Sequence, residues 1–131
     1  MLNIVYIGKP NQTNSFICEV IRSNYSTEIT FHQPDKLLEE PEALNDEGID
    51  LAILDLNSSY GIGSAPSIIA KINTQLKTSP LLVLYPSNYN FITPLVEAGA
   101  DGVISNTPME TVIIKSIDRL LNGEQFISNP N

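Results

Sequence analysis

A strand-length apolar run that ends in an acid constrains the fold of this chain more than any other feature. Residues 49–54 are apolar except for Asp50, and Asp55 follows them directly. Nearly continuous apolar runs of this length are typical of parallel strands buried on both faces. In open α/β sheets, ligands and chemistry gather at the carboxyl ends of such strands. The pattern therefore predicts a parallel sheet with Asp55 at its functional edge.

Strand-like and helix-like segments alternate along the whole chain. Strands are expected at residues 2–7, 27–31, 50–54, 80–85 and 101–105. Helical periodicity is expected at residues 13–22, 35–45, 64–76, 89–98 and 107–122. Strands that alternate with helices are joined by right-handed crossovers into a sheet covered on both faces. The predicted fold class is therefore α/β, a doubly wound, five-stranded parallel sheet of flavodoxin-like type with five helices.

Particular residues mark the ends and the buried faces of these helices. Pro41 predicts that the second helix is short or kinked, and Gly99 predicts a left-handed residue at the end of the fourth. Residues 107–110 resemble a capping box with Pro108 at the first helical position. The side chains expected to face the core from the first and last helices are Phe16, Ile17, Val20, Ile21, Ile113, Ile117, Leu120 and Leu121.

The composition favours a single globular domain that spans residues 1–131. Hydrophobic residues make up 42% of the chain and charged residues 17%, which excludes a disordered class. The net charge of −8, with only seven Lys plus Arg and no basic cluster, argues against direct nucleic-acid binding. No membrane-length apolar run and no basic leader are seen, and the single Cys18 is expected to be packed and reduced. We therefore expect a cytoplasmic domain with no membrane contact.

A candidate site follows from the predicted sheet, because the carboxyl ends of its strands share one edge. The residues at or just after these ends are Gly8, Lys9, Asp55, Asn57, Tyr85 and Asn106.

Three motifs make a family resemblance specific. They are residues 50–56 (Asp-Leu-Ala-Ile-Leu-Asp-Leu) with Gly63 after them, residues 97–102 (Glu-Ala-Gly-Ala-Asp-Gly), and the closing residues 121–128. With these motifs the whole chain resembles a receiver domain of two-component response regulators, most like the subclass joined to helix-turn-helix transcription factors. The resemblance implies that Asp55 stands at the phosphoacceptor position and that the carbonyl of Asn57 stands at a backbone metal ligand.

The chain departs from this family at the residues that would assist Asp55 in handling the phosphoryl group. The family places an acidic pair for Mg²⁺ where this chain has Ile7 and Gly8, or Gly8 and Lys9. Tyr85 replaces a Thr or Ser, and Asn106 replaces a Lys. A single carboxylate holds Mg²⁺ poorly, and each lost charge contact at a phosphoryl-transfer site costs about 10² or more in rate. These departures predict a degenerate pseudo-receiver without a cofactor, without Mg²⁺ and without enzymatic activity.

Two hypotheses concern how the altered site is filled. In the first, the ammonium of Lys9 pairs with Asp55 in place of a metal; the alternative is a solvated loop lysine. In the second, the ring of Tyr85 plugs the phosphate pocket; the alternative is a ring that points to solvent.

Other classes of site find little support in the sequence. The Gly61-Ile62-Gly63 segment lacks the third glycine and the acid of a dinucleotide loop. Residues 10–15 lead into a helix amino terminus, which favours a helix cap over an anion site. His32 is the only histidine, so neither a metal cluster nor a Ser-His-Asp set can be assembled.

The predicted function is that of an atypical receiver domain in signal transduction and transcription regulation. It is expected to act by contact with a protein partner or a tethered effector domain, and independently of phosphorylation. It is also expected to form a homodimer through helical faces. The polar tail from residue 124 is interpreted as a linker toward a DNA-binding domain. Two alternatives stay open. One is a phosphorylatable receiver that uses Asp55, and the other is a small-ligand sensor with a pocket at Gly8, Asp55, Tyr85 and Asn106.

Overall fold

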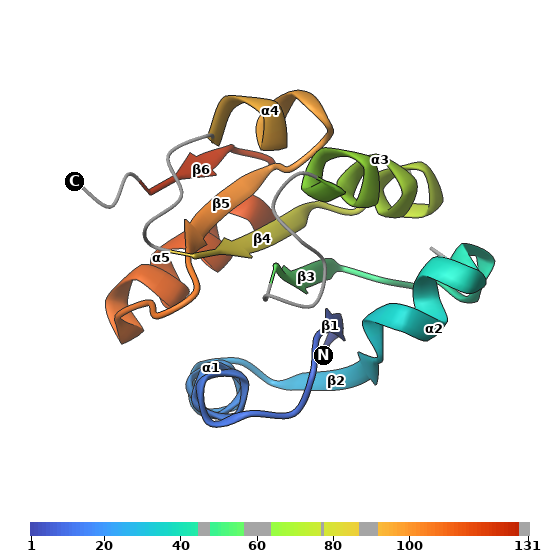
Figure 1. Cartoon of the computed structure of the whole chain (residues 1–131). Coiled ribbons are helices and arrows are strands. Elements are labelled where there is room, and N and C mark those ends of the chain that lie inside the picture. The colour runs from blue at the N-terminus through green and yellow to red at the C-terminus, as the bar shows by residue number, and fades with distance from the viewer. Residues whose placement is uncertain (45–47, 57–63, 77, 87–91, 129–131) are drawn as a thin grey trace.

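The computed structural model of the chain describes residues 1–44, 48–56, 64–76, 78–86 and 92–128. In this part of the chain a parallel six-stranded sheet has helices on both faces (Figure 1). Its strands are β1 (Leu2–Ile7), β2 (Thr27–His32), β3 (Leu51–Asp55), β4 (Leu81–Tyr85), β5 (Gly102–Ser105) and β6 (Phe126–Ile127). The helices are α1 (Gln12–Asn24), α2 (Pro34–Glu39), α3 (Ala65–Leu76), α4 (Ile92–Glu97) and α5 (Glu110–Leu121).

The strand order is β2-β1-β3-β4-β5-β6, and each neighbouring pair is parallel. The order of the first five strands is the flavodoxin-like one, in which the strand order reverses between β1 and β3 while every strand stays parallel. The predicted fold class is confirmed, with one strand more than the five expected.

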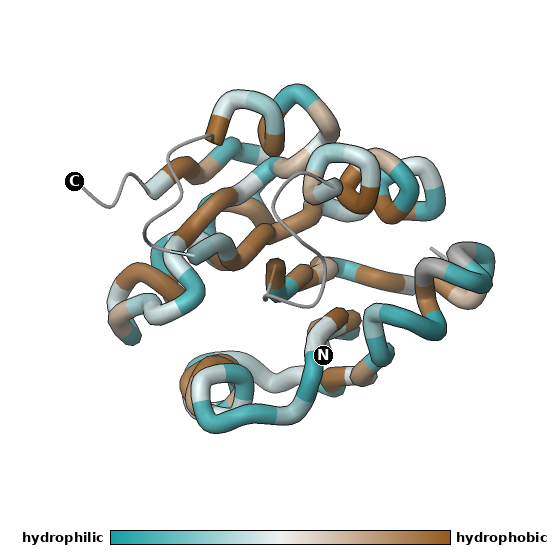
Figure 2. Tube along the Cα trace, in the orientation of Figure 1, coloured by the Kyte–Doolittle hydropathy of each residue, from teal (hydrophilic) through white to brown (hydrophobic). Residues whose placement is uncertain are grey.

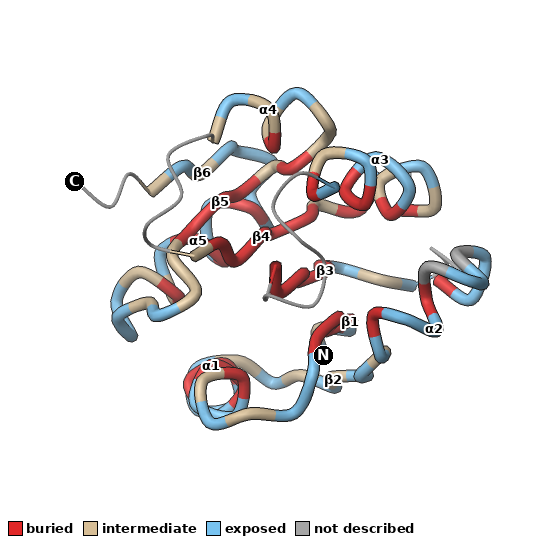
Figure 3. The backbone as a smooth tube through the Cα atoms, in the orientation of Figure 1, coloured by how far each residue is buried: buried red, intermediate tan, exposed pale blue. Residues whose placement is uncertain are grey.

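Two apolar cores cover the two faces of the sheet. Every residue of β3 and β4 is buried, and the hydropathy and burial views show these apolar strands inside the molecule (Figures 2 and 3). Side chains alternate along a strand, so neighbours in sequence serve opposite cores. The core beneath α1 and α5 contains Ile4, Tyr6, Ile17, Ile21, Leu51, Ile53, Leu82, Leu84, Ile104, Ile113, Ile117 and Leu120. The core beneath α2, α3 and α4 contains Val5, Ile7, Leu37, Leu54, Ile68, Ile69, Ile72, Leu76, Val83, Tyr85, Leu95 and Val103.

Helix α1 faces the sheet through a stripe slightly different from the expected one. Ile17, Val20 and Ile21 are buried as predicted, but the side chain of Phe16 is 43% exposed. Cys18 is buried in its place, which confirms that it is packed. At 3.6 residues per turn the centre of the buried face passes between Ile17 and Ile21, so Phe16 lies off its edge.

The start and the buried face of α5 also differ from expectation. The helix begins at Glu110 after Met109, which provides no side-chain cap, so the predicted capping box is wrong. The backbone N–H of Thr107 instead donates to Ser105 Oγ at 3.2 Å, which holds this segment in a turn before the helix. Leu121, expected in the core, is 38% exposed.

The interpretation of the tail as a linker is wrong for residues 126–127, because they form β6. The N–H of Phe126 donates to the carbonyl of Asp101 at 3.1 Å, and the N–H of Ser128 donates to that of Val103 at 2.9 Å. The guanidinium of Arg119 lies 6.0 Å from the centroid of the Phe126 ring. These contacts attach the tail to the edge of the sheet.

Two helix-end predictions are confirmed. Helix α2 ends at Glu39 and is followed by a separate 3-10 turn, η1 (Pro41–Ala43), as expected from Pro41. Gly99 follows α4 with a φ of 126°, a backbone conformation that residues other than glycine rarely adopt. Within the described ranges, no helix has the length and apolar character that a bilayer crossing requires.

Candidate functional site

Asp55 is a buried carboxylate at the carboxyl end of β3. Asp55 is only 4% exposed, and its Cα is paired with that of Leu84 on β4. Because side chains alternate along β3, Asp55 lies on the same face as Ile53, the face covered by α1 and α5. The structure thus places Asp55 at the predicted edge, oriented toward the start of α1.

The side chain of Asn14 is the hydrogen-bond donor to Asp55. Its Nδ2 lies 3.0 Å from Asp55 Oδ2 and 2.7 Å from the backbone carbonyl oxygen of Lys9. The hydroxyl of Tyr6 donates to Asn14 Oδ1. One amide therefore uses both of its N–H groups on oxygen atoms and accepts a hydrogen bond on its own oxygen. We refer to Tyr6, Asn14, Asp55 and the Lys9 carbonyl as the Asp55 network.

The first turn of α1 fixes the position of Asn14. Asn11 is the N-cap residue, and its Oδ1 accepts a hydrogen bond from the backbone N–H of Asn14 at 2.7 Å. The expected helix cap in residues 10–15 is confirmed by this contact. Asn14 is only 3% exposed, so its hydrogen bonds are sheltered from water. Such bonds are stronger in this low-dielectric setting, and breaking them is correspondingly costly.

Burial dominates the electrostatics of the Asp55 network. It raises the pKa of Asp55, and the hydrogen bond from Asn14 opposes this rise only in part. Burial also raises the pKa of Tyr6, with further contributions from Cys18 and the negative charge of Asp55. The Tyr6 hydroxyl therefore keeps its proton and remains a donor to Asn14 over the whole physiological range.

Gly8 lets these side chains approach each other closely. A Cβ atom at this position would lie 3.1 Å from Asn14 Nδ2, 3.2 Å from Asp55 Cβ and 3.3 Å from Tyr6 Cε1. Contacts this short force the neighbours to move. A carboxylate at position 8 would therefore require Asn14, Asp55 and Tyr6 to shift by a few tenths of an ångström, which gives a structural reason for glycine there.

The predicted ion pair between Lys9 and Asp55 is not formed. Lys9 is exposed, and within the described residues no ion pair joins its ammonium to Asp55. Only the backbone carbonyl of Lys9 takes part in the site. Asp55 Oδ2 instead accepts a hydrogen bond from a neutral amide, that of the buried Asn14.

Tyr85 is buried as one hypothesis required, but on the other face of the sheet. Its side chain belongs to the core beneath α3 and α4, whereas Asp55 faces α1. Its hydroxyl donates to the carbonyl of Ser128 at 3.4 Å. The ring therefore packs in the core beneath α3 and α4, and its hydroxyl contacts the residue that follows β6. It does not plug a pocket over Asp55.

The remaining predicted site residues are only partly gathered around Asp55. The N–H of Asn106 donates to the carbonyl of Tyr85 at 2.7 Å, so Asn106 lies beside β4 and is half-buried. Asn57 lies outside the described residues. The ligand pocket expected from Gly8, Asp55, Tyr85 and Asn106 is not assembled in that form, because Tyr85 faces away from Asp55.

Sequence reasoning missed the two residues that bind the site together, Tyr6 and Asn14. A signal for Asn14 was present, since it falls one turn before Ile17 and Cys18 on the buried stripe of α1. A polar residue on an apolar stripe is expected to hydrogen-bond inside the protein. Tyr6 carries the corresponding signal as a phenol among the buried apolar residues of β1, Ile4, Val5 and Ile7.

Comparison with solved structures identifies the fold. A LuxR family DNA-binding response regulator from Silicibacter pomeroyi matches with a TM-score of 0.74 at 18% identity, covering 98% of this chain and 97% of that one. The isolated REC domain of RcsB from Salmonella enterica serovar Typhimurium, solved with the phosphomimetic BeF3−, matches with 0.74 at 17% identity over 98% and 94%. An RcsB response regulator from Salmonella typhimurium matches with 0.75 at 16% identity over 98% of this chain and 62% of that one.

No protein-family model and no curated protein matches the sequence. At these identities the structural likeness establishes the fold, and the chain has the receiver fold of response regulators.

Proposed function

We propose that this chain is a regulatory receiver domain that signals by protein contact and does not depend on phosphorylation of Asp55. The observation that carries the proposal is the placement of the Asn14 amide. Its Nδ2 lies between Asp55 Oδ2 and the Lys9 carbonyl, two oxygen atoms that would otherwise attract a cation. The two N–H groups of this amide thus bond to the two oxygen atoms, in the place where a receiver with an acidic pair would hold a metal ion.

The donor set around Asp55 does not fit Mg²⁺. This ion requires near-octahedral oxygen ligands and usually binds through one or more carboxylates that are free to coordinate it. Here one carboxylate is buried and already bonded to Asn14. Within the described residues, no three carboxylate, imidazole or thiol side chains gather where they could hold a metal. We therefore propose a domain that works without Mg²⁺, without another cofactor and without catalysis.

The proposal includes a protein partner as the output of the domain. The net charge of −8 disfavours contact of this domain with nucleic acid, so a protein partner is the expected route of its signal. We propose a tethered effector domain or a separate protein as the partner, together with homodimerisation through helical faces. The fold likeness to DNA-binding response regulators supports the tethered arrangement. A cytoplasmic setting belongs to the same proposal and is supported by the reduced, packed Cys18.

The competing function is a receiver in which Asp55 accepts a phosphoryl group, and its position at the end of β3 is the observation in its favour. The two are separated by incubating the protein with acetyl phosphate and Mg²⁺ and measuring its intact mass. We expect no phosphoryl adduct beyond that of an Asp55→Asn control. An adduct in the unaltered protein that the control lacks would establish the competing function.

A further inference from the structure

A cavity lies between α1 and the carboxyl end of β2, and it borders the Asp55 network through Gly8 and Asn14. Its volume is about 400 Å³, within the range of roughly 300–1,000 Å³ that holds small ligands. The residues that matter most for its chemistry are Asn14, Ser15, Cys18, Arg22, Phe31 and His32.

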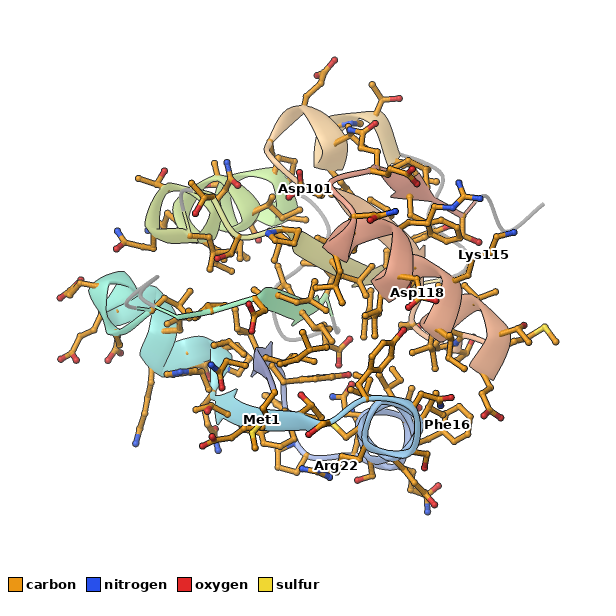
Figure 4. All side chains as sticks on the ribbon, turned by 180° about the vertical axis from the view of Figure 1, so that it is seen from behind. Met1, Phe16, Arg22, Asp101, Lys115 and Asp118 are labelled. Atoms are coloured by element: carbon orange, nitrogen blue, oxygen red, sulfur yellow. The ribbon has the colours of Figure 1, made fainter. Side chains whose placement is uncertain are left out.

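One side of α1 forms a wall of this cavity. Asn14, Cys18 and Arg22 are spaced four residues apart, so they lie above one another on a single helical face. In Figure 4, α1 is seen nearly end on, with Arg22 on the side of β2 and Phe16 on the side of α5. The opposite wall is the end of β2, where Phe31 is 52% exposed and its ring lies 5.5 Å from the ring of Tyr6.

The lining combines an apolar surface with cationic and neutral donors. Phe31, Pro10 and the buried Cys18 supply the apolar surface. Burial raises the pKa of Cys18, and the nearby Arg22 opposes this rise only in part, so the thiol is neutral and adds no negative charge. Arg22 supplies a guanidinium, and Ser15 and His32 supply further polar groups.

The charge of the lining differs from that of the whole protein. No residue that lines the cavity is acidic, although the chain carries fifteen Asp plus Glu and a net charge of −8. Arg22 also makes no ion pair with another side chain in the described part of the chain. A guanidinium without a carboxylate partner, beside an exposed aromatic face, suits a planar anion.

We propose that this cavity binds small aromatic carboxylates, with the carboxylate on Arg22 and the ring against Phe31. Asn14 lines the cavity and also donates to Asp55, so a bound ligand acts directly on the Asp55 network. This coupling rests on the proposed function, in which the network replaces metal and phosphate as the regulated element. Binding itself does not depend on that function.

The test is a titration of the ¹⁵N-labelled protein with cinnamate and with phenylacetate, followed by NMR. We expect saturable shifts of the backbone amides of Cys18 and Phe31 and of the side-chain amide of Asn14. Cinnamyl alcohol, which has the same shape without the charge, is expected to bind at least about tenfold more weakly, because it loses a charge-assisted contact. Arg22→Gln should weaken cinnamate binding by about the same factor.

Arg119→Gln is the matched control, because Arg119 is the other arginine of the chain and lies on α5 near β6. It should leave cinnamate binding unchanged. The site is overturned if neither carboxylate causes saturable shifts up to about 10 mM, or if Arg22→Gln and Arg119→Gln behave alike. The coupling is overturned if cinnamate binds through Arg22 while the Asn14 side-chain amide does not shift. A response to Mg²⁺ and phosphate analogues would contradict the proposed function alone.

Discussion

Replacing Asn14 with aspartate tests the Asp55 network at its centre, because the change is nearly isosteric. It removes the Nδ2 donor to Asp55 Oδ2 and to the Lys9 carbonyl and puts a second carboxylate beside the first. A hydrogen bond to a charged group is worth about 1.5–3 kcal/mol and a neutral one about 0.5–1.5 kcal/mol. With both residues buried, we expect Asn14→Asp to lower the free energy of unfolding by about 3–5 kcal/mol near neutral pH.

The loss should depend on pH with a definite sign. Two adjacent buried carboxylates share a proton, which raises the pKa of the pair in the folded protein above its value in the unfolded chain. The folded variant then binds more protons than the unfolded chain, so its stability rises as pH falls. Urea unfolding should therefore show a large loss at about pH 8 and a smaller one at about pH 5.

The same variant provides a gain-of-function readout. Two carboxylates beside the Lys9 carbonyl form an oxygen-rich site, so Mg²⁺ should stabilise Asn14→Asp and leave the unaltered protein unchanged. With a Kd of about 1 mM, about 10 mM Mg²⁺ would add roughly 1.4 kcal/mol. Asn24→Asp is the control, because Asn24 is exposed near the end of the same helix. It loses only the hydrogen bond from Asn24 Nδ2 to the Val20 carbonyl at 2.8 Å, so its cost should stay below about 2 kcal/mol and should not respond to Mg²⁺. A loss below about 1 kcal/mol for Asn14→Asp, without pH dependence, would refute the reasoning.

Three further predictions use the same unfolding assay. Tyr6→Phe leaves Asn14 Oδ1 buried without its donor and should cost about 1–3 kcal/mol. Asp55→Asn should stabilise the protein at neutral pH, because burial raises the pKa of Asp55 above its ordinary 3.8. The gain in the free energy of unfolding should vanish as pH falls through the folded pKa, and a gain that does not change with pH would contradict this prediction. Tyr85→Thr, which restores the residue type of the family, should cost about 3 kcal/mol or more by opening a cavity in the α3 and α4 core, and should not permit phosphorylation by acetyl phosphate.

The architecture could be predicted because its signals are local and repeated. The apolar runs of β3 and β4 are long enough to be recognised as buried strands, and the stripe of α3 buries Ile68, Ile69 and Ile72 as expected. Strand β6 was missed because it has only two residues and its pairing is decided by the neighbouring edge of β5. Phe16 was misplaced because periodicity fixes a helical face only to within about one residue.

The site was predicted in position but not in contacts. The order of the strands puts Gly8 and Asp55 at one edge, and this followed from the pattern alone. Which group bonds to Asp55 depends on side-chain reach, since Lys9 and Asn14 both follow β1 closely in sequence. The amide prevails because a buried carboxylate requires a donor inside the core, whereas an ammonium is strongly hydrated and remains in water.

The most direct test of the central claim is a titration of the unaltered, ¹⁵N-labelled protein with Mg²⁺ and beryllofluoride. The account predicts that the amides of Gly8 and Leu56 and the side-chain amide of Asn14 keep their positions, because Asn14 already occupies Asp55 Oδ2. Saturable shifts of these resonances that require both Mg²⁺ and beryllofluoride would show that Asp55 is open to a phosphoryl group, and would contradict the account.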